Sequence, residues 1–329
     1  MHYVEDPEGE RIMQLVLMTA DEPDFLKSWV LYHGSLFGYE NLHILDSSTD
    51  PQVAQFLSIA HTLGVDVTYS AGDLSVMKES INKKMAAIVK RSDFLIKMDT
   101  DEFLVVYHPD GPDNKKFEAD RVSMQRALHS LPFDGKMYKV TYHSSAKIER
   151  NCSHDGSRDM VMQSTVFSTP GKSTIKTFFN SQSYKSIDLG SHWGWVQPGF
   201  DDKHFHASPL AILEFSRCYE RFVERCRLAC ISHGYMSAND TKEQAVVKLS
   251  KLLQPGKCLV PSCHKVQYYV DHLTNPRDAR EAYNEQFSRD GSGGDFKSAG
   301  GVGNIEITAV RDVVLSAEQQ LRPILEDSP

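Results

Sequence analysis

The chain opens with a regular alternation between short apolar runs and longer segments in which apolar residues recur every three or four positions. Apolar runs of about five residues are typical of buried strands, whereas the longer spacing is typical of amphipathic helices. The strands predicted in this way cover 12–18, 41–45, 65–69, 94–98 and 103–107. Because helical patterns separate the first four, we expect a parallel sheet with helices on both faces.

Local signals mark the ends of these helices. Gly38 follows an apolar face that includes Trp29 and His33, and glycine is common just after the end of a helix. Asp50 followed by Pro51 is typical of an N-cap and first helical turn. The alternation of strand and helix is therefore supported by the residues at its boundaries.

The later part of the chain is predicted to be mostly helical. Ser208 followed by Pro209 has the pattern of a helix start, and 242–253 is a second candidate helix. The glycine-rich segment 290–303 is expected to be flexible. A capping-box pattern that begins at Ser316 predicts a short last helix.

Composition narrows the class of protein. The 329 residues include 36 basic and 44 acidic ones, a net charge of −8, which argues against a nucleic-acid-binding protein. No apolar run approaches the ~20 residues of a membrane span. The acidic start lacks the pattern of a signal peptide. We therefore expect a soluble, cytoplasmic protein as the chain stands, or a protein of a secretory lumen if an anchor has been trimmed.

Six cysteines are too few for a disulfide scaffold in a chain of this length. Cys218, Cys226 and Cys230 fall in a helical pattern and are interpreted as buried thiols. Cys258 and Cys263 could form half of a zinc site or a small disulfide loop. Without a second ligand pair at a suitable spacing, two unrelated thiols is the favoured interpretation.

Acidic residues follow three of the expected strands. The segment 19–22 ends in two acids, Asp46 follows the second strand, and Asp99 and Asp101 follow the fourth. Ligands bind at the carboxyl ends of strands in such sheets. Alternate residues of an extended segment face the same way, so Asp99 and Asp101 would offer oxygen ligands to one cation. The alternative is that both are turn residues that end a strand.

These residues stand in an order that resembles the GT-A glycosyltransferases, and within them the group related to families 2 and 92. The resemblance covers about the first 110 residues and rests on EPDFLKSWVLYH at 22–33, LHILDSSTD at 42–50 and LIKMDTDEF at 95–103. A weaker echo follows in Lys176, GSHWG at 190–194 and the pair His204 and His206. Asp21 departs from the family pattern, which usually has asparagine there.

The resemblance implies an α/β fold of the GT-A, Rossmann-like type: a mixed, mainly parallel sheet flanked by helices, with a helical C-terminal part. It implies one domain over 1–289, with a nucleotide-sugar half over about 1–110 and an acceptor half over about 111–289. Residues 290–329 would add the flexible segment and a short C-terminal helix. The implied activity is metal-dependent transfer of a hexosyl or pentosyl group from a UDP- or GDP-sugar to a hydroxyl of a glycan, protein or other acceptor, with inversion.

Site residues follow from the resemblance by position. Donor contacts are implied for Thr19, Ala20, Glu22, Asp46, Asn82 and Asp99. A divalent cation, Mn²⁺ or Mg²⁺, is implied at Asp99 and Asp101, with a third ligand from His192 or His206. Nitrogen ligation would favour manganese. Any of these histidines could instead serve only packing.

An inverting transfer needs a base that deprotonates the acceptor hydroxyl. The candidate carboxylates in the second half of the chain are Glu149, Asp155, Asp159 and Asp188, and the sequence does not choose among them. Trp193 and Trp195 could stack on a sugar ring, although tryptophans beside a glycine turn also suit ordinary packing.

Two other functions fit acids at strand ends. A nucleotidyltransferase or phosphate hydrolase would use the same acids, but the residues after the first strand lack the usual glycine-rich, basic loop. A non-catalytic sugar-binding module would keep the fold without the reaction. The intact pair of aspartates at 99 and 101 argues against that alternative.

Overall fold

The computed structural model describes residues 9–69, 74–111, 116–135, 137–144, 161, 166–168, 176–200, 205–215, 217, 219–254, 257–258, 260, 262–286 and 304–326. These residues fall into two compact units. The sheet unit contains the described residues up to 215 and those from 304 onward. The helical unit contains the described residues from 217 to 286.

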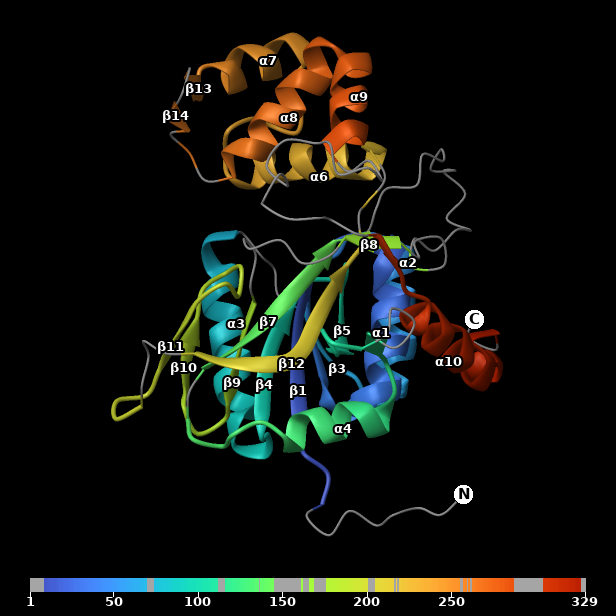
Figure 1. The fold of residues 1–329 in the computed structure, drawn as a ribbon. Coiled ribbons are helices and arrows are strands. Elements are labelled where there is room, and N and C mark those ends of the chain that lie inside the picture. Colours follow the sequence, from blue (N-terminus) through green and yellow to red (C-terminus); the bar gives the residue numbers. More distant parts are fainter. Residues whose placement is uncertain are drawn as a thin grey trace. The chain divides into compact units, whose positions relative to one another are not determined.

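A nine-stranded mixed sheet forms the centre of the sheet unit (Figure 1), with the strand order β3-β2-β1-β4-β9-β7-β12-β5-β6. Its strands are β1 Met13–Thr19, β2 Leu42–Asp46, β3 Asp66–Tyr69, β4 Phe94–Met98, β5 Glu102–Tyr107, β6 Phe117–Glu118, β7 Met137–Ser144, β9 Lys176–Asn180 and β12 Phe205–Glu214. Strands β1 to β4 run parallel to their neighbours among themselves, and β9 is antiparallel to both β4 and β7. The predicted α/β class, with parallel N-terminal strands in a mixed sheet, is confirmed.

Helices cover both faces of this sheet (Figure 1). One face packs against α1 Pro23–Phe37, α2 Pro51–Thr62, α4 Arg121–His129 and α10 Ala309–Glu326. The other packs against α3 Leu74–Ile88 and the hairpin of β10 Tyr184–Ile187 and β11 Gly194–Val196. Short elements complete the unit: η1 Tyr39–Asn41, η2 Val89–Arg91, and the paired β8 Val166–Ser168 and β15 Asn304–Glu306. The expected helices between the first four strands are confirmed.

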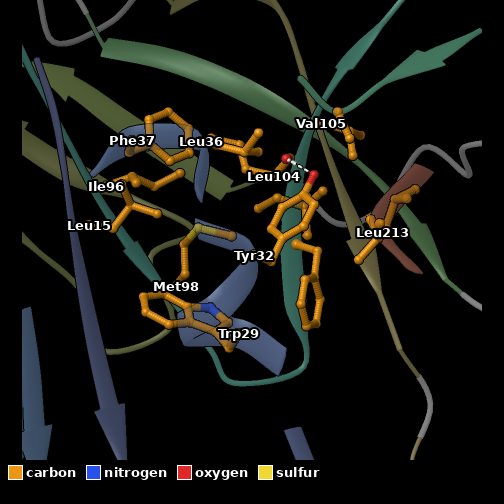
Figure 2. Close-up of a cluster of buried hydrophobic side chains, with 14 of the residues drawn as sticks. Leu15, Trp29, Tyr32, Leu36, Phe37, Ile96, Met98, Leu104, Val105 and Leu213 are labelled. Atoms are coloured by element: carbon orange, nitrogen blue, oxygen red, sulfur yellow. Dashed lines mark hydrogen bonds between the residues drawn. The ribbon is translucent and has the colours of Figure 1, made fainter. Parts of the chain in front are cut away.

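Helix α1 is fixed to the sheet by both apolar and polar contacts (Figure 2). Its Trp29 and Tyr32 are fully buried, and Gly38 ends the helix at φ +90°. The Tyr32 hydroxyl donates to the carbonyl of Leu104 at 2.7 Å, and the amide of Leu104 donates to Nε2 of His33 at 3.3 Å. Two α1 side chains thus satisfy the backbone of β5 directly after the Asp99–Asp101 segment.

The helical unit has a core of its own. It contains α6 Tyr219–Ser232, α7 Lys242–Ser250, α8 Cys263–Thr274, α9 Pro276–Gln286 and the short pair β13 Leu253–Gln254 and β14 Lys257–Cys258. Cys226 and Cys230 are free and buried in that core, as expected. Cys263 is disulfide-bonded, so its interpretation as an unrelated thiol is wrong. A helical C-terminal region is confirmed.

Two local helix predictions fail because tertiary contacts outweigh local signals. Ser208 and Pro209 lie inside β12, which pairs with β7 on one side and β5 on the other. Pro209 is tolerated there because the register with β7 shifts between Ala207 and Ala211, where the proline need not donate to the ladder. Ser316 is not a cap, since α10 already begins at Ala309.

The domain division also differs from the expected boundary near residue 289. Helix α10 belongs with the sheet, because its Val310, Val314 and Ala317 are buried in the same core as α1. The segment 290–303, expected to be flexible, lies outside the described residues. No helix in the described part of the chain is long and apolar enough to cross a membrane.

Candidate functional site

The carboxyl ends of β1, β2 and β4 meet at one edge of the sheet. Thr19 is in register with Asp46, and Leu17 with Met98, which immediately precedes Asp99. In the sheet, β2 and β3 follow on one side of β1, whereas β4 lies on its other side. The direction in which successive strands are placed therefore reverses between β1 and β4. Sheets of this kind bind ligands at such a switch point. The expected convergence of the strand-end acids is confirmed.

Asp21 joins the loops that follow β1 and β2. Its Oδ1 accepts the amides of Thr49 at 2.7 Å and Asp50 at 2.8 Å, and its own amide donates to the Ser48 hydroxyl. Its φ is +51°, a left-handed conformation that aspartate and asparagine tolerate best after glycine. Aspartate therefore suits this position both by its backbone conformation and by the two amides that its side chain accepts.

The residues predicted to contact the nucleoside surround this loop. Asp46 is buried and, within the described part of the chain, accepts one hydrogen bond, from the Ser48 amide at 3.0 Å. The Thr19 hydroxyl is buried without a hydrogen-bond partner among the described residues. Ala20 follows it, and Glu22 is buried at the N-cap of α1. Thr19 and Asp46 therefore retain hydrogen-bonding capacity at the switch point.

The segment from Asp99 to Glu102 is a tight turn and not the extended segment assumed from the sequence. The Glu102 amide donates to the carbonyl of Asp99 at 3.2 Å, and the Asp99 amide donates to Oε2 of Glu102 at 2.7 Å. The carbonyl of Asp101 accepts the amide of Phe215, which follows β12. The interpretation of Asp99 and Asp101 as turn residues is therefore right for the backbone. The turn leaves the Asp99 side chain half-exposed and buries that of Asp101.

Asp99 is held between two buried lysines. Its Oδ2 lies 3.1 Å from Nζ of Lys176, and its Oδ1 contacts Nζ of Lys97. Lys176 also contacts Oε2 of the buried Glu102. The Asp99 side chain is nevertheless 46% exposed, whereas Lys176 is 0% exposed. We call Asp99, Lys97, Lys176 and Glu102 the Asp99 cluster. In it the Asp99 carboxylate is reached by solvent, and the two lysines that contact it are buried.

The two lysines of the Asp99 cluster stabilise the charge on Asp99. Partial burial opposes the charge on Asp99, but the adjacent Lys176 and Lys97 outweigh it, so the pKa of this carboxyl lies well below its usual range. Burial raises the pKa of Glu102, against the attraction of Lys176. Burial also opposes the charge on Lys176, but Asp99 and Glu102 raise its pKa above the ordinary value. Asp99 is therefore an ionised carboxylate at neutral pH.

These residues fit a divalent cation in part. Asp99 offers an exposed, ionised carboxylate, which is the hard oxygen ligand that such cations prefer. Asp101 is buried, and no group of three or more His, Cys, Asp or Glu among the described residues could hold a metal. A cation here would need oxygen atoms from the substrate and water besides Asp99.

The structure separates the two candidate histidine ligands. His206 lies at the start of β12, where Nε2 is 2.8 Å from Asp134 Oδ2 and the ring lies tilted by 31° against that of Tyr138. The register places His206 beside Tyr138, toward the amino ends of the strands and away from Asp99. His192 is exposed and follows Ser191, whose carbonyl accepts the amide of Thr177 at 2.7 Å. Thr177 follows Lys176, which contacts Asp99, so the turn that holds His192 lies at the same edge of the sheet as Asp99. Of the two candidate ligands, His192 is therefore the one on the Asp99 side.

The remaining predicted residues are divided between the site and its support. Asn82 ties α3 to the hairpin: its amide donates to the carbonyl of Ile187 and accepts from the Ile187 amide and the Tyr184 hydroxyl, while its second donated bond goes to Lys78 within α3. Asp188 begins the hairpin turn, and its Oδ1 accepts the amide of Trp193 at 3.1 Å. Glu149, Asp155, Asp159 and His204 lie outside the described residues.

Sequence reasoning missed the role of Lys97 and Glu102. Lys97 stands in an otherwise apolar run, and a lysine there signals a buried partner. Glu102 was visible in the motif, but its contact with Lys176 joins residues 74 positions apart.

Comparison with family models and with curated proteins gives no match. What the structure establishes is a mixed α/β protein whose N-terminal strands are parallel and end in acids. The resemblance to glycosyltransferases stays a prediction.

Proposed function

We propose that this protein is a metal-dependent glycosyltransferase that moves a sugar from a nucleotide-sugar donor to an acceptor hydroxyl. The observation that carries the proposal is the ionised, half-exposed carboxylate of Asp99 at the switch point of the sheet. Asp46 and Thr19 stand at the neighbouring strand ends. This arrangement suits a ligand with a nucleoside at one end and a charged diphosphate at the other.

The chain's own residues bind and orient the donor. Asp46 accepts a hydrogen bond from a ribose hydroxyl or a base N–H, and the Thr19 hydroxyl, which has no partner among the described residues, gains one in the same step. The backbone of Ala20 and the carboxylate of Glu22 complete the nucleoside side of the site. Asp21 fixes these two loops before the donor arrives, which lowers the entropy cost of binding.

Asp99 is the residue that would hold Mn²⁺ or Mg²⁺, together with donor phosphates and water. When bound, the cation would neutralise the charge that develops on the nucleoside diphosphate as the bond to the sugar breaks. Lys176 and Lys97 keep the Asp99 carboxylate ionised and oriented throughout.

With inversion at the sugar carbon, a carboxylate takes the proton of the acceptor hydroxyl as that oxygen attacks. Of the four candidates, Asp188 is the one that the structure describes. It lies in the hairpin turn that is hydrogen-bonded to Thr177, beside Lys176. Asp188 is therefore our candidate for the base among the described residues.

A thermal-shift panel of UDP-, GDP- and dTDP-sugars, with Mn²⁺ or with EDTA, tests the proposal. A ligand at ~100 times its dissociation constant stabilises the fold by about 2.7 kcal/mol. We expect one nucleotide series to raise the melting temperature only with the cation. Asp99→Asn should lose this effect, whereas Asp134→Asn, at the opposite edge, should keep it.

Product analysis separates the alternatives. A glycosyltransferase releases a nucleoside diphosphate from the donor. A nucleotidyltransferase acting in reverse consumes added pyrophosphate and releases a nucleoside triphosphate and the sugar 1-phosphate, whereas a hydrolase of the diphosphate linkage consumes water and releases a nucleoside monophosphate and the sugar 1-phosphate. Saturable binding without either product would indicate a non-catalytic sugar-binding module. No stabilisation by any nucleotide, with Mn²⁺ present and the protein folded, would refute the proposal.

A further inference from the structure

The β10–β11 hairpin carries two tryptophans on its outer surface. Trp193 is 42% exposed and Trp195 is 39% exposed, whereas the third tryptophan, Trp29, is fully buried. Between them Gly194 faces inward, where a Cβ atom would lie 2.2 Å from Cζ of Phe179. Because alternate residues of an extended segment point to the same side, Trp193 and Trp195 lie on the side of the chain opposite to Gly194, with an edge of Trp193 against Phe205 of β12.

The hairpin that presents these rings is firmly held. Asn82 ties its backbone to α3 through Ile187, and Tyr184 donates to the same amide. Thr177 donates twice to the carbonyl of Ser191, through its amide and its hydroxyl. The exposed rings are therefore carried on a fixed scaffold, which reduces the ordering cost of binding.

The two indoles lie beside polar groups. Nζ of Lys78 lies 5.2 Å from the ring centroid of Trp195, and Lys139 lies over Phe205, whose ring contacts Trp193 edge-on. His192 is exposed in the same turn, and Asp188 begins it. An apolar surface with hydrogen-bonding groups at its rim suits a ring that has a C–H face and hydroxyls around it.

The size of the surface also decides between occupants. A large aromatic side chain contributes at most about 250 Å², so two rings exposed by about 40% offer about 200 Å². A stable protein interface needs about 800 Å² from each partner. A single sugar ring or two fits this area, whereas a second copy of the chain does not.

We infer that Trp193 and Trp195 form a carbohydrate-binding platform, on which the C–H face of a saccharide stacks. The platform continues from the candidate site, since Ser191 in its turn is bonded to the neighbour of Lys176. Its occupant is the saccharide of the acceptor. That role as acceptor rests on the proposed function, whereas saccharide binding by the two indoles does not.

Intrinsic fluorescence provides the test, because only two of the three tryptophans are exposed. The full chain is titrated with β-linked hexasaccharides of glucose, N-acetylglucosamine, galactose, mannose and xylose, without nucleotide. We expect a saturable change in emission and protection from acrylamide quenching with at least one of them. Absence of both effects for all five sugars overturns the proposal.

Variants connect the signal with the rings. Trp195→Ala should weaken the binding of that sugar at least tenfold, and Trp195→Phe, which keeps an aromatic face, should stay within threefold of the unmodified protein. Leu189→Ala, an exposed apolar residue in the same turn, is the matched control and should bind normally. Equal binding by Trp195→Ala, by Trp193→Ala and by the unmodified protein overturns the proposal.

The result is independent of the donor site. The same variants are assayed for stabilisation by nucleoside diphosphate with Mn²⁺, and we expect that stabilisation to be unchanged. Sugar binding without any stabilisation by nucleotide would support the carbohydrate-binding platform and refute the proposed transferase. Stabilisation by nucleotide without sugar binding would refute the platform and support the donor site of the proposed transferase. Protection by phosphatidylcholine vesicles, with none from saccharides, would overturn the assignment of the platform to carbohydrate.

Discussion

Two polar clusters lie on the same sheet, toward opposite ends of its parallel strands. The Asp99 cluster lies at the carboxyl ends, and the His43 cluster lies in the amino-terminal part of β1, β2 and β3. The His43 cluster consists of Gln14, Asn41, His43, Asp66 and Lys84. Each cluster joins buried side chains to a carboxylate that water reaches, since Asp99 is 46% and Asp66 is 39% exposed.

Charge and exposure therefore do not distinguish the two clusters. In the His43 cluster, Asp66 accepts from His43 at 2.7 Å and from Lys84 at 3.1 Å, much as Asp99 accepts from its lysines. The clusters differ in what surrounds them. Among the described residues of the sheet unit, two that are not glycine have φ in the left-handed region. They are Asp21 and Ser191, and both lie at the carboxyl edge, near Asp99.

Unsatisfied buried groups do not distinguish the two edges by themselves. The hydroxyls of Thr19 and Ser191 are buried without a partner within the described residues and lie near the carboxyl edge, but Nδ2 of Asn180, opposite Phe94 at the start of β4, is in the same state. Backbone strain costs free energy and is often found where a ligand is bound. The comparison teaches that a charged cluster becomes a candidate site through its position at the switch point and the strained residues around it.

Removal of Lys176 should give the largest change in stability. Lys176→Met leaves the buried Glu102 without its ammonium partner, and we expect the free energy of unfolding to fall by about 3–5 kcal/mol. Lys84→Met should cost at most about 1 kcal/mol, because water reaches Asp66. Urea unfolding at pH 7 measures both. Lys176→Met/Glu102→Met should recover part of the loss, and equal losses for the two single variants would break the comparison.

The second prediction concerns activity at the two carboxylates. Asp99→Asn should reduce the release of nucleoside diphosphate at least 100-fold, or about 2.7 kcal/mol of transition-state stabilisation. Asp66→Asn should stay within twofold, since its cluster lies away from the switch point. Steady-state rates, with circular dichroism as a check of folding, measure the pair. A comparable loss in Asp66→Asn would show that the His43 cluster takes part in the reaction.

The third prediction concerns the pH dependence of stability that arises from His33, whose Nε2 accepts the Leu104 amide of β5. Burial lowers the pKa of His33 from 6.5 to about 3, against the opposing effect of its hydrogen bond to the Trp29 carbonyl. The folded protein keeps His33 neutral while the unfolded chain takes up a proton below pH 6.5, so stability falls as the pH drops from 6.5 toward 3. At pH 5 the loss is about 2 kcal/mol.

His33→Gln should remove this contribution. The slope of unfolding free energy against pH between 6 and 4 should become smaller by about 1.4 kcal/mol per pH unit. His61→Gln, an exposed histidine of α2, is the control and should keep the slope. An unchanged slope in His33→Gln would show that His33 is not held neutral.

The smallest effect separates the two candidate ligands. His192→Ala should raise the Mn²⁺ concentration for half-maximal nucleotide stabilisation about fivefold, or about 1 kcal/mol. His206→Ala should leave it within twofold and instead lower the melting temperature, because the contact with Asp134 is lost. Equal metal requirements in both variants and the unmodified protein would leave the cation on Asp99, phosphates and water.

Much of the first hundred residues could be predicted because the signals are local. The apolar run 94–98 and the pair Asp50 and Pro51 act within a few residues, and the structure has β4 and the start of α2 there. Gly38 ends α1 as its sequence position indicates. By contrast, Ser208 and Pro209 carry a helical signal, but pairing with two distant strands made that segment part of β12.

The sequence by itself determined the strand-helix alternation, the acids at the strand ends and hence the edge of the sheet where a ligand is expected. The tertiary structure alone decided the partners of those acids. Lys176 meets Asp99 across 77 positions, and His206 pairs with Asp134 and not with the Asp99 edge. The physical reason is that backbone signals act over one or two turns, whereas ion pairs and unmade hydrogen bonds depend on which distant strands become neighbours.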